Sequence, residues 1–157
     1  MQDIETTNQS DIADFPSIPE SGRILALDPG TKKIGIAVSD RLQTISTRLK
    51  TVKRTNWKKL LQEITVLIND FDAVALVVGL PLNTDGSESE MSSEARKMAR
   101  NFSLSLSIPV VLQDERVSTY QARSNLWENG ASTTKTRSLV DAEAAAVILR
   151  DFLARPK

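Results

Sequence analysis

Apolar residues in this chain fall into short continuous runs and into longer runs with helical spacing. The short runs are typical of strands buried on both faces, because no polar residue alternates with the apolar ones. They cover residues 24–27, 73–79 and 110–112. After the first run Pro29-Gly30 marks a tight turn, and apolar residues return at every second position from Ile34 to Val38, which predicts a β-hairpin. We also expect a strand over 44–52, where β-branched residues are frequent.

Helical spacing predicts the remaining elements. Asn56 is suited to cap a helix that reaches Phe71, and a second helix is expected from Ser87 to about Phe102. Further along we expect a short helix over about 119–128, a small-polar loop over 131–136 and a last helix over about 138–153. Trp57 lies on the apolar stripe of the first helix, so we interpret it as a core residue rather than a base-stacking one.

This order of elements predicts an α/β fold. We expect a mixed sheet with helices on its faces, in which the three apolar runs form central strands. With 157 residues the chain is long enough for one domain with a proper core, which we place at residues 23–157. No stretch reaches the roughly 18 apolar residues that a membrane span needs, so we expect no membrane contact.

The absence of Cys and His narrows the chemistry that this chain can carry out. Without Cys, disulfides and thiolate metal sites are excluded, and a reducing compartment such as the cytoplasm is the expected location. Without His, imidazole metal ligands and Ser-His or Cys-His nucleophile systems are excluded. Any catalysis must therefore use carboxylates, Lys, Arg, Tyr, hydroxyl groups or bound ions.

The formal net charge of zero conceals an uneven distribution. Residues 1–22 contain five acidic residues and no basic one, so the remainder of the chain is mildly basic. A basic body is compatible with a polyanionic partner such as nucleic acid. We expect the acidic segment 1–22, which is polar and contains Pro16 and Pro19, to be a disordered tail.

Three carboxylates lie where predicted elements begin or end. Asp28 follows the first apolar run, and Glu115 follows the third after Gln113-Asp114. Asp141 begins a stripe that continues through Ala145 and Ile148, on the helix face that we expect to pack on the sheet. In mixed α/β sheets, sites gather where neighbouring strand ends diverge. These three residues are therefore our candidate catalytic and metal-binding residues.

Each of these acids also has a simpler explanation. Asp28 could be an Asx-type turn residue, Asp141 could compensate the charge of a helix N-terminus, and Glu115 could pair with Arg116. Three carboxylates within a few ångströms would repel one another, and a divalent cation that prefers hard oxygen ligands would resolve this. Mg²⁺ fits best, with Mn²⁺ as a substitute, and such a cluster suits phosphodiester hydrolysis.

Basic residues lie next to the candidate carboxylates in the sequence. Lys32 and Lys33 occupy the hairpin turn after Asp28, and Arg116 follows Glu115 directly. Lys135 and Arg137 lie in or beside the small-polar loop. We expect these five residues to contact the phosphates of a nucleic acid.

Four segments together resemble the YqgF/RuvX family of RNase H-like proteins, which are related to the RuvC Holliday-junction resolvases. They are LALDPGTKKIGIAVSD, VVGLPL followed by NTDG, VVLQDERVST and VDAEAAAVIL. The resemblance covers about residues 23–153. It implies a five-stranded sheet whose first three strands are antiparallel, and it implies an acidic triad at Asp28, Glu115 and Asp141.

The resemblance implies a nuclease that matures the 5′ end of 16S ribosomal RNA. The alternative substrate is a four-way DNA junction. Cleavage of a Holliday junction would need a homodimer, whereas a monomer could process RNA. A ribosome-assembly factor that binds nucleic acid without cutting it is a further alternative. The segment Asp28-Pro29-Gly30-Thr31 also resembles the first phosphate loop of actin-like ATPases and sugar kinases, but those need two such domains and this chain supplies one.

Overall fold

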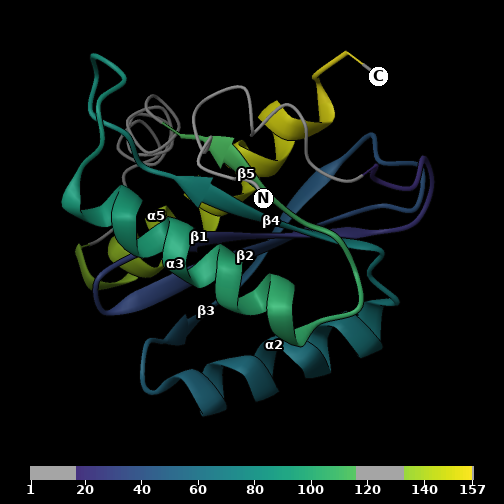
Figure 1. Ribbon diagram of the computed structural model, residues 1–157, viewed down its shortest axis with the longest axis horizontal. Coiled ribbons are helices and arrows are strands. Elements are labelled where there is room, and N and C mark those ends of the chain that lie inside the picture. The colour runs from purple at the N-terminus through teal and green to yellow at the C-terminus, as the bar shows by residue number, and fades with distance from the viewer. Residues whose placement is uncertain (1–16, 116–132, 157) are drawn as a thin grey trace, which may run out of the picture.

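The computed structural model of this chain describes residues 17–115 and 133–156, with side chains described for 17–115 and 142–156. Five strands form one sheet in the order β3-β2-β1-β4-β5 (Figure 1). The strands are β1 (Ile24–Pro29), β2 (Lys33–Ser39), β3 (Ser46–Lys53), β4 (Ala75–Leu80) and β5 (Val110–Asp114). All five lie within or close to the segments in which the hydrophobic pattern predicts strands.

The directions of the strands confirm the predicted mixed α/β sheet. The pairs β1–β2 and β2–β3 are antiparallel, whereas β1–β4 and β4–β5 are parallel. The first three strands are thus antiparallel, as expected of an RNase H-like domain. One expectation is wrong, because β5 is the last strand of the described sheet rather than a central one. Its apolar run reflects burial of both faces, since Val110, Val111 and Leu112 are all buried, and says nothing about neighbours along its edges.

In the described part of the chain three helices pack on the sheet: α2 (Trp57–Phe71), α3 (Glu90–Ser105) and α5 (Thr133–Leu153). The predicted cap of the first helix is confirmed, because Asn56 Oδ1 accepts a hydrogen bond from the Lys59 amide at 2.8 Å. The α3 helix begins later than expected, behind a capping box in which Ser89 and Ser92 each bond the other's backbone amide. No helix in the described part of the chain is long and apolar enough to cross a bilayer.

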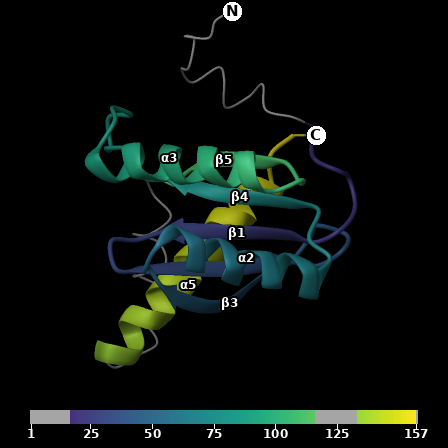
Figure 2. The same cartoon turned by 60° about the horizontal axis from the view of Figure 1, so that its bottom comes forward.

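The two faces of the sheet carry separate cores (Figure 2). On one face Leu25, Leu27 and their neighbours pack under α2 and α3, and we call this the α2–α3 core. On the other face Ile24, Ala26 and their neighbours pack under α5, and we call this the α5 core. The α5 core is rich in alanine from both the sheet and the helix, so the helix can lie close to the strands.

The helix α5 begins earlier than predicted, at Thr133. The expectation of a small-polar loop over 131–136 is therefore wrong from residue 133 onward, and Lys135 lies within the helix. From 133 to 153 the chain has no Gly or Pro to stop a helix, and the Ser/Thr residues impose only a small propensity cost. The predicted short helix over 119–128 lies outside the described residues, as does most of the tail.

The described end of the tail lies against the domain. The Gln43 side-chain amide donates hydrogen bonds to the carbonyls of Pro19 and Gly22, at 2.8 and 3.1 Å. The Gly22 amide donates to the Arg41 carbonyl at 2.7 Å, and Ile18 packs against the α5 core. These contacts fix the entry of the chain into β1.

Candidate active site at the carboxyl end of the parallel strands

The strand β1 carries Asp28 to the α5 side of the sheet. Side chains alternate along a strand, and Ile24 and Ala26 belong to the α5 core, whereas Leu25 and Leu27 belong to the α2–α3 core. Asp28 continues the first series. It is half-buried at the end of the strand, so its carboxylate lies between the core and the surface.

Glu115 follows β5 and is held close to β4. Its backbone amide donates a hydrogen bond to the Leu80 carbonyl at 3.1 Å, and the residue is only 5% exposed. A Cβ placed on Gly79 would lie 2.8 Å from Glu115 Oε2 and 2.6 Å from Ile148 Cδ1. Since Ile148 belongs to the α5 core, the Glu115 carboxylate also lies on the α5 side. The missing side chain at Gly79 provides the space that this carboxylate and Ile148 occupy.

The sheet register places Asp28 beside that carboxylate. Leu27 pairs with Val78 in the parallel β1–β4 ladder, so Asp28 is level with Gly79 on the next strand. Neighbouring strands lie about 4.8 Å apart, and Glu115 reaches over Gly79 from the far side. The fold therefore brings two of the three predicted acids to one end and one face of the sheet.

The third predicted acid, Asp141, lies in α5, four residues before Ala145 of the α5 core. Its side chain is outside the described ones. Among the side chains that are described, no group of three or more acidic residues is placed to hold a metal ion. Two carboxylates nevertheless suit Mg²⁺ or Mn²⁺, because Mg²⁺ is commonly bound through one or two carboxylates while waters and substrate phosphates complete its coordination.

The turn between β1 and β2 presents an exposed group of lysines beside Asp28. Lys32 and Lys33 are exposed there, and Lys33 lies directly opposite Lys53 in the β2–β3 ladder. Like charges directly opposite each other in a sheet are destabilising. No ion pair within the described part of the chain involves any of these three lysines. A polyanion bound here would relieve their repulsion.

Arg54 fixes this turn from behind. Its Nη1 donates to the Gly30 carbonyl at 2.9 Å, its backbone amide donates to the Lys32 carbonyl at 2.8 Å, and its Nη2 lies 3.0 Å from Glu94 Oε1 on α3. A Cβ on Gly30 would come within 2.6 Å of the Lys33 carbonyl oxygen. The turn is therefore held in two ways. Its own backbone packs closely between Gly30 and Lys33, and Arg54 bonds two of its carbonyl groups.

The other predicted phosphate contacts cannot be placed beside these lysines. Arg116 lies outside the described residues. Lys135 and Arg137 lie in the first turns of α5 rather than in a loop, and their side chains are not among those described. Their role in binding stays a prediction.

Three residues of this region were not singled out from the sequence. Gly79 is a small residue at the end of an apolar strand, before Leu-Pro-Leu, and that position was the signal for a close approach of another group. Lys53 and Arg54 carried no local signal, because they join the β1–β2 turn only through pairing of β2 with β3.

Comparison with known proteins places the chain in a family. A family model described as "RuvX: Holliday junction resolvase" matches residues 22–155. A protein of Cereibacter sphaeroides named "Putative pre-16S rRNA nuclease" is 39% identical over 145 residues, which is 92% of this chain and 91% of the relative. A protein of Paracoccus denitrificans with the same name is 37% identical and covers 88% of each chain. Among solved structures, T. thermophilus RuvC in complex with Holliday junction substrate superposes with a TM-score of 0.48 at 15% identity, over 87% of this chain and 99% of that one.

Proposed function

This chain belongs to the RuvX family, and on that basis we propose that it is a metal-dependent endonuclease that hydrolyses phosphodiester bonds in structured nucleic acid. The observation that carries the proposal is the position of Asp28 and Glu115. They lie at one end and on one face of the sheet, beside the exposed Lys32 and Lys33 of the β1–β2 turn and Lys53 at the end of β3. An ordinary turn-forming Asp28 would not need a buried second carboxylate next to it.

In this proposal Asp28, Glu115 and Asp141 hold a divalent cation, Mg²⁺ or Mn²⁺. When bound, such a cation activates a water and stabilises the leaving oxygen of a phosphodiester. The carboxylates of the chain orient the bound group, and the burial of Glu115 against Gly79 keeps its carboxylate in one position. Lys32, Lys33 and Lys53 bind the phosphates that flank the reacting one, and we assign Arg116, Lys135 and Arg137 the same task.

As substrate we propose precursor 16S rRNA, because both relatives described above carry the name "Putative pre-16S rRNA nuclease". We place the cut at the 5′ end of that RNA, as the family resemblance of the sequence implies. The enzyme would then work in the cytoplasm, where ribosomal RNA precursors are processed. A single active site is sufficient for this reaction, so a monomer could carry it out.

A four-way DNA junction is the second candidate substrate, and the description of the matching family model favours it. Resolution of a junction needs two cuts related by a two-fold axis, and therefore a homodimer. The oligomeric state of the active species in solution thus bears directly on the choice between the two substrates.

Both candidates can be tested side by side with the purified full chain in Mg²⁺ buffer. The substrates are an RNA that carries the 5′ precursor end of 16S rRNA, a four-way DNA junction and a linear DNA duplex of matching sequence. We expect cleavage of the RNA near the mature end and loss of that cleavage in Glu115→Gln. Symmetric cuts in the junction by a dimer would establish the second candidate instead. Binding of both substrates without cleavage would contradict the nuclease proposal and support an assembly factor.

A further inference from the structure

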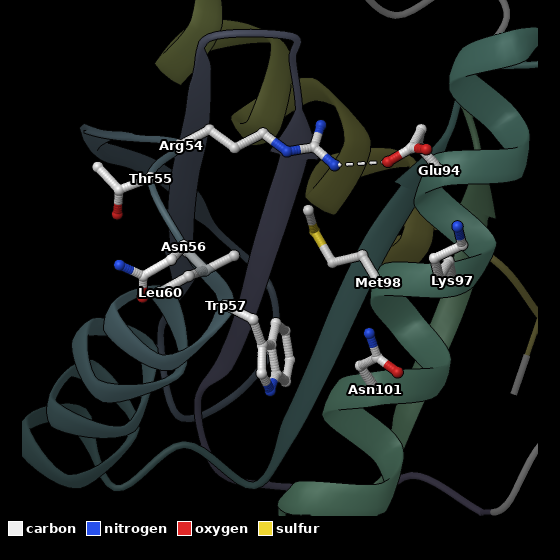
Figure 3. Close-up of a pocket in the computed structure, with 9 residues that line it drawn as sticks. All are labelled: Arg54, Thr55, Asn56, Trp57, Leu60, Glu94, Lys97, Met98 and Asn101. Carbon is white, nitrogen blue, oxygen red and sulfur yellow. Dashed lines mark hydrogen bonds and ion pairs between the residues drawn. The ribbon is translucent and has the colours of Figure 1, made fainter.

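A cavity of about 220 Å³ lies between the start of α2 and the middle of α3 (Figure 3). We call it the α2–α3 pocket, and its principal lining residues are Arg54, Trp57, Leu60, Lys97, Met98 and Asn101. These helices cover the face of the sheet opposite α5. The pocket is therefore distinct from the candidate active site, and nothing in the proposed nuclease chemistry uses it.

The pocket is nevertheless connected to the candidate active site through Arg54. The same guanidinium that lies in the pocket wall donates to the Gly30 carbonyl, two residues after Asp28, and reaches Glu94 on α3. The α2 helix begins at Trp57, shortly after β3 ends at Lys53, and Lys53 pairs with Lys33 in the turn. A nucleic-acid strand that follows the lysines of the turn away from Asp28 thus comes to the pocket next.

Trp57 gives the pocket an aromatic wall with a defined position. Its ring centroid lies 4.7 Å from that of Phe102, with the planes tilted by 60°, and Phe102 is fully buried. Figure 3 shows the indole directed into the space between the two helices, with Met98 above it. Sequence periodicity predicted Trp57 as a core residue, and the structure shows it half-buried, in contact with the α2–α3 core and also lining the pocket.

The polar groups of the pocket come from α3 and from the segment between β3 and α2. Lys97 is exposed at the rim, and Asn101 provides an amide that can both donate and accept hydrogen bonds. The Arg54 guanidinium is partly neutralised by Glu94, whose Oε1 lies 3.0 Å from Arg54 Nη2. Lys97 is the other cation of the pocket, and no ion pair within the described part of the chain involves it. Asn56 also lines the pocket, but its Oδ1 is used to cap α2.

This combination fits a planar heterocycle that carries a negative charge. A purely apolar ligand would form no hydrogen bond with Asn101. A free phosphate would make no favourable contact with the indole of Trp57 or with the apolar side chains of Leu60 and Met98. Nucleobases stack on aromatic side chains and offer hydrogen-bonding edges, and the attached phosphate would face Lys97. The volume is below the roughly 300 Å³ at which pockets for drug-sized ligands begin, so the pocket suits one ring system.

We propose that the α2–α3 pocket binds the base of one unpaired nucleotide in the substrate strand, outside the candidate active site. This inference rests on the proposed function in one respect, namely that the bound nucleotide belongs to the nucleic-acid strand that the enzyme cuts. It assigns Trp57 as the stacking residue, Asn101 as the group that contacts the base edge and Lys97 as the phosphate contact. An unpaired nucleotide at a fixed distance from the cut would select single-stranded or frayed ends over perfect duplex.

The test measures the affinity of the full chain for a short single-stranded RNA and for an RNA duplex of the same sequence. It is done in Ca²⁺ buffer, where binding can be followed separately from cleavage. We expect Trp57→Leu to weaken binding of the single strand on the order of tenfold, with Trp57→Phe retaining most of the affinity and duplex binding unchanged. Lys97→Gln should weaken binding and lower its salt dependence, whereas Arg100→Gln, an exposed cation of α3 outside the pocket, should not.

Fluorescence provides a second readout that does not depend on whether Trp57→Leu folds. The chain has two tryptophans, so in Trp127→Phe all tryptophan emission comes from Trp57. We expect the single-stranded RNA to quench this emission and Asn101→Leu to reduce the quenching at a given RNA concentration.

Several outcomes would overturn the proposal. They are unchanged single-strand affinity in both Trp57→Leu and Lys97→Gln, absence of quenching, or adenosine monophosphate binding as tightly as the oligonucleotide, which would indicate a nucleotide pocket unrelated to the substrate strand. If the wild type cleaves neither RNA nor junction but these binding results hold, the nuclease proposal fails and the pocket assignment stands.

Discussion

Glu115 and a side chain at position 79 would occupy the same space on the α5 side of the sheet. Glycine at this position is required for room rather than for an unusual backbone angle, because its φ is not among the positive ones in this structure. The atoms that a Cβ would meet are the ends of two side chains, Glu115 Oε2 and Ile148 Cδ1. Either side chain could move, but both are buried, so movement has a cost.

Substitution of Gly79 by Ala should therefore separate stability from activity. We expect Gly79→Ala to lower the free energy of unfolding by about 1–3 kcal/mol through overpacking. We also expect it to lower the cleavage rate on the order of 100-fold, because the Glu115 carboxylate is displaced. Denaturant unfolding and a cleavage assay on the same preparation measure the two effects.

Ile148→Val provides the matched control, since it deletes the Cδ1 atom that the new methyl group would meet. In the double variant Gly79→Ala/Ile148→Val, part of the stability should return while cleavage stays low, because the contact with Glu115 remains. Recovery of full activity in the double variant would show that Ile148, and not the carboxylate, explains the need for glycine.

Asp40 shows a second residue-scale effect, at the opposite end of the sheet. Its carboxylate accepts hydrogen bonds from the amides of Ile45 and Thr44 and from the Thr44 hydroxyl, at 2.8, 2.8 and 2.9 Å. These bonds, the Ile45 amide first, lower the pKa of Asp40 from its usual 3.8 to about 2. They fix the turn between β2 and β3, where Gln43 adopts a positive φ of 59°.

The lowered pKa of Asp40 predicts a definite pH dependence. Because the folded pKa lies below the unfolded one, the stabilisation is fully present above pH 3.8 and is lost as the pH falls towards about 2. The difference in unfolding free energy between wild type and Asp40→Asn should be constant at higher pH and should shrink across this window. Chemical denaturation at a series of pH values measures it. A difference that stays constant down to pH 2 would show that the carboxylate charge contributes nothing to the turn.

At the scale of elements, the hydrophobic pattern predicted where strands and helices lie but not which of them meet. The apolar runs identified β1, β4 and β5, yet placed β5 in the centre, because burial of two faces looks the same in central and edge strands. The start of α5 was missed because Ser and Thr are compatible with both helix and loop. The proximity of Asp28 and Glu115 could be predicted, because each follows an apolar run that the sequence identifies as a strand. The roles of Gly79 and Arg54 could not be predicted, because both act through partners that are distant in sequence.

The β1–β2 turn and the end of β3 form one basic element, and its contribution to binding can be measured by salt dependence. If Lys33 and Lys53 each contact a phosphate, Lys33→Ala and Lys53→Ala should each weaken binding of RNA and DNA alike. Each should also reduce the slope of log affinity against log salt by about one. Arg41→Ala is the matched control, because Arg41 is exposed in the turn at the other end of β2. Equal slopes for all four proteins would show that the two lysines do not contact phosphates.

At the scale of the whole molecule, the candidate active site and the α2–α3 pocket lie on opposite faces of the sheet, near the same end of it. The carboxylates lie on the α5 side, the α2–α3 pocket lies on the other side, and the lysines of the β1–β2 turn lie between them. A strand that crosses this end of the sheet would be cut on one face and held on the other. This arrangement makes the divalent-cation site at Asp28 and Glu115 the central claim, since the other contacts only position the strand.

The central claim is tested most directly with Asp28→Asn, which removes one charge with little change in shape. Asp114→Asn is the control, because Asp114 is also an acid at a strand end but alternates to the α2–α3 side of β5. The measurement is the thermal melting of wild type and both variants with and without Mg²⁺, together with cleavage of the precursor RNA by the same three proteins.

We predict that wild type and Asp114→Asn gain thermal stability from Mg²⁺ by mass action and cleave the RNA. Asp28→Asn should cleave nothing, should lose most of the Mg²⁺ gain, and should melt in metal-free buffer at the same or a slightly higher temperature because repulsion with Glu115 is relieved. A loss of about 1 kcal/mol in Asp28→Asn with or without metal, as for a turn-forming aspartate, together with equal Mg²⁺ shifts in all three proteins, would contradict the claim.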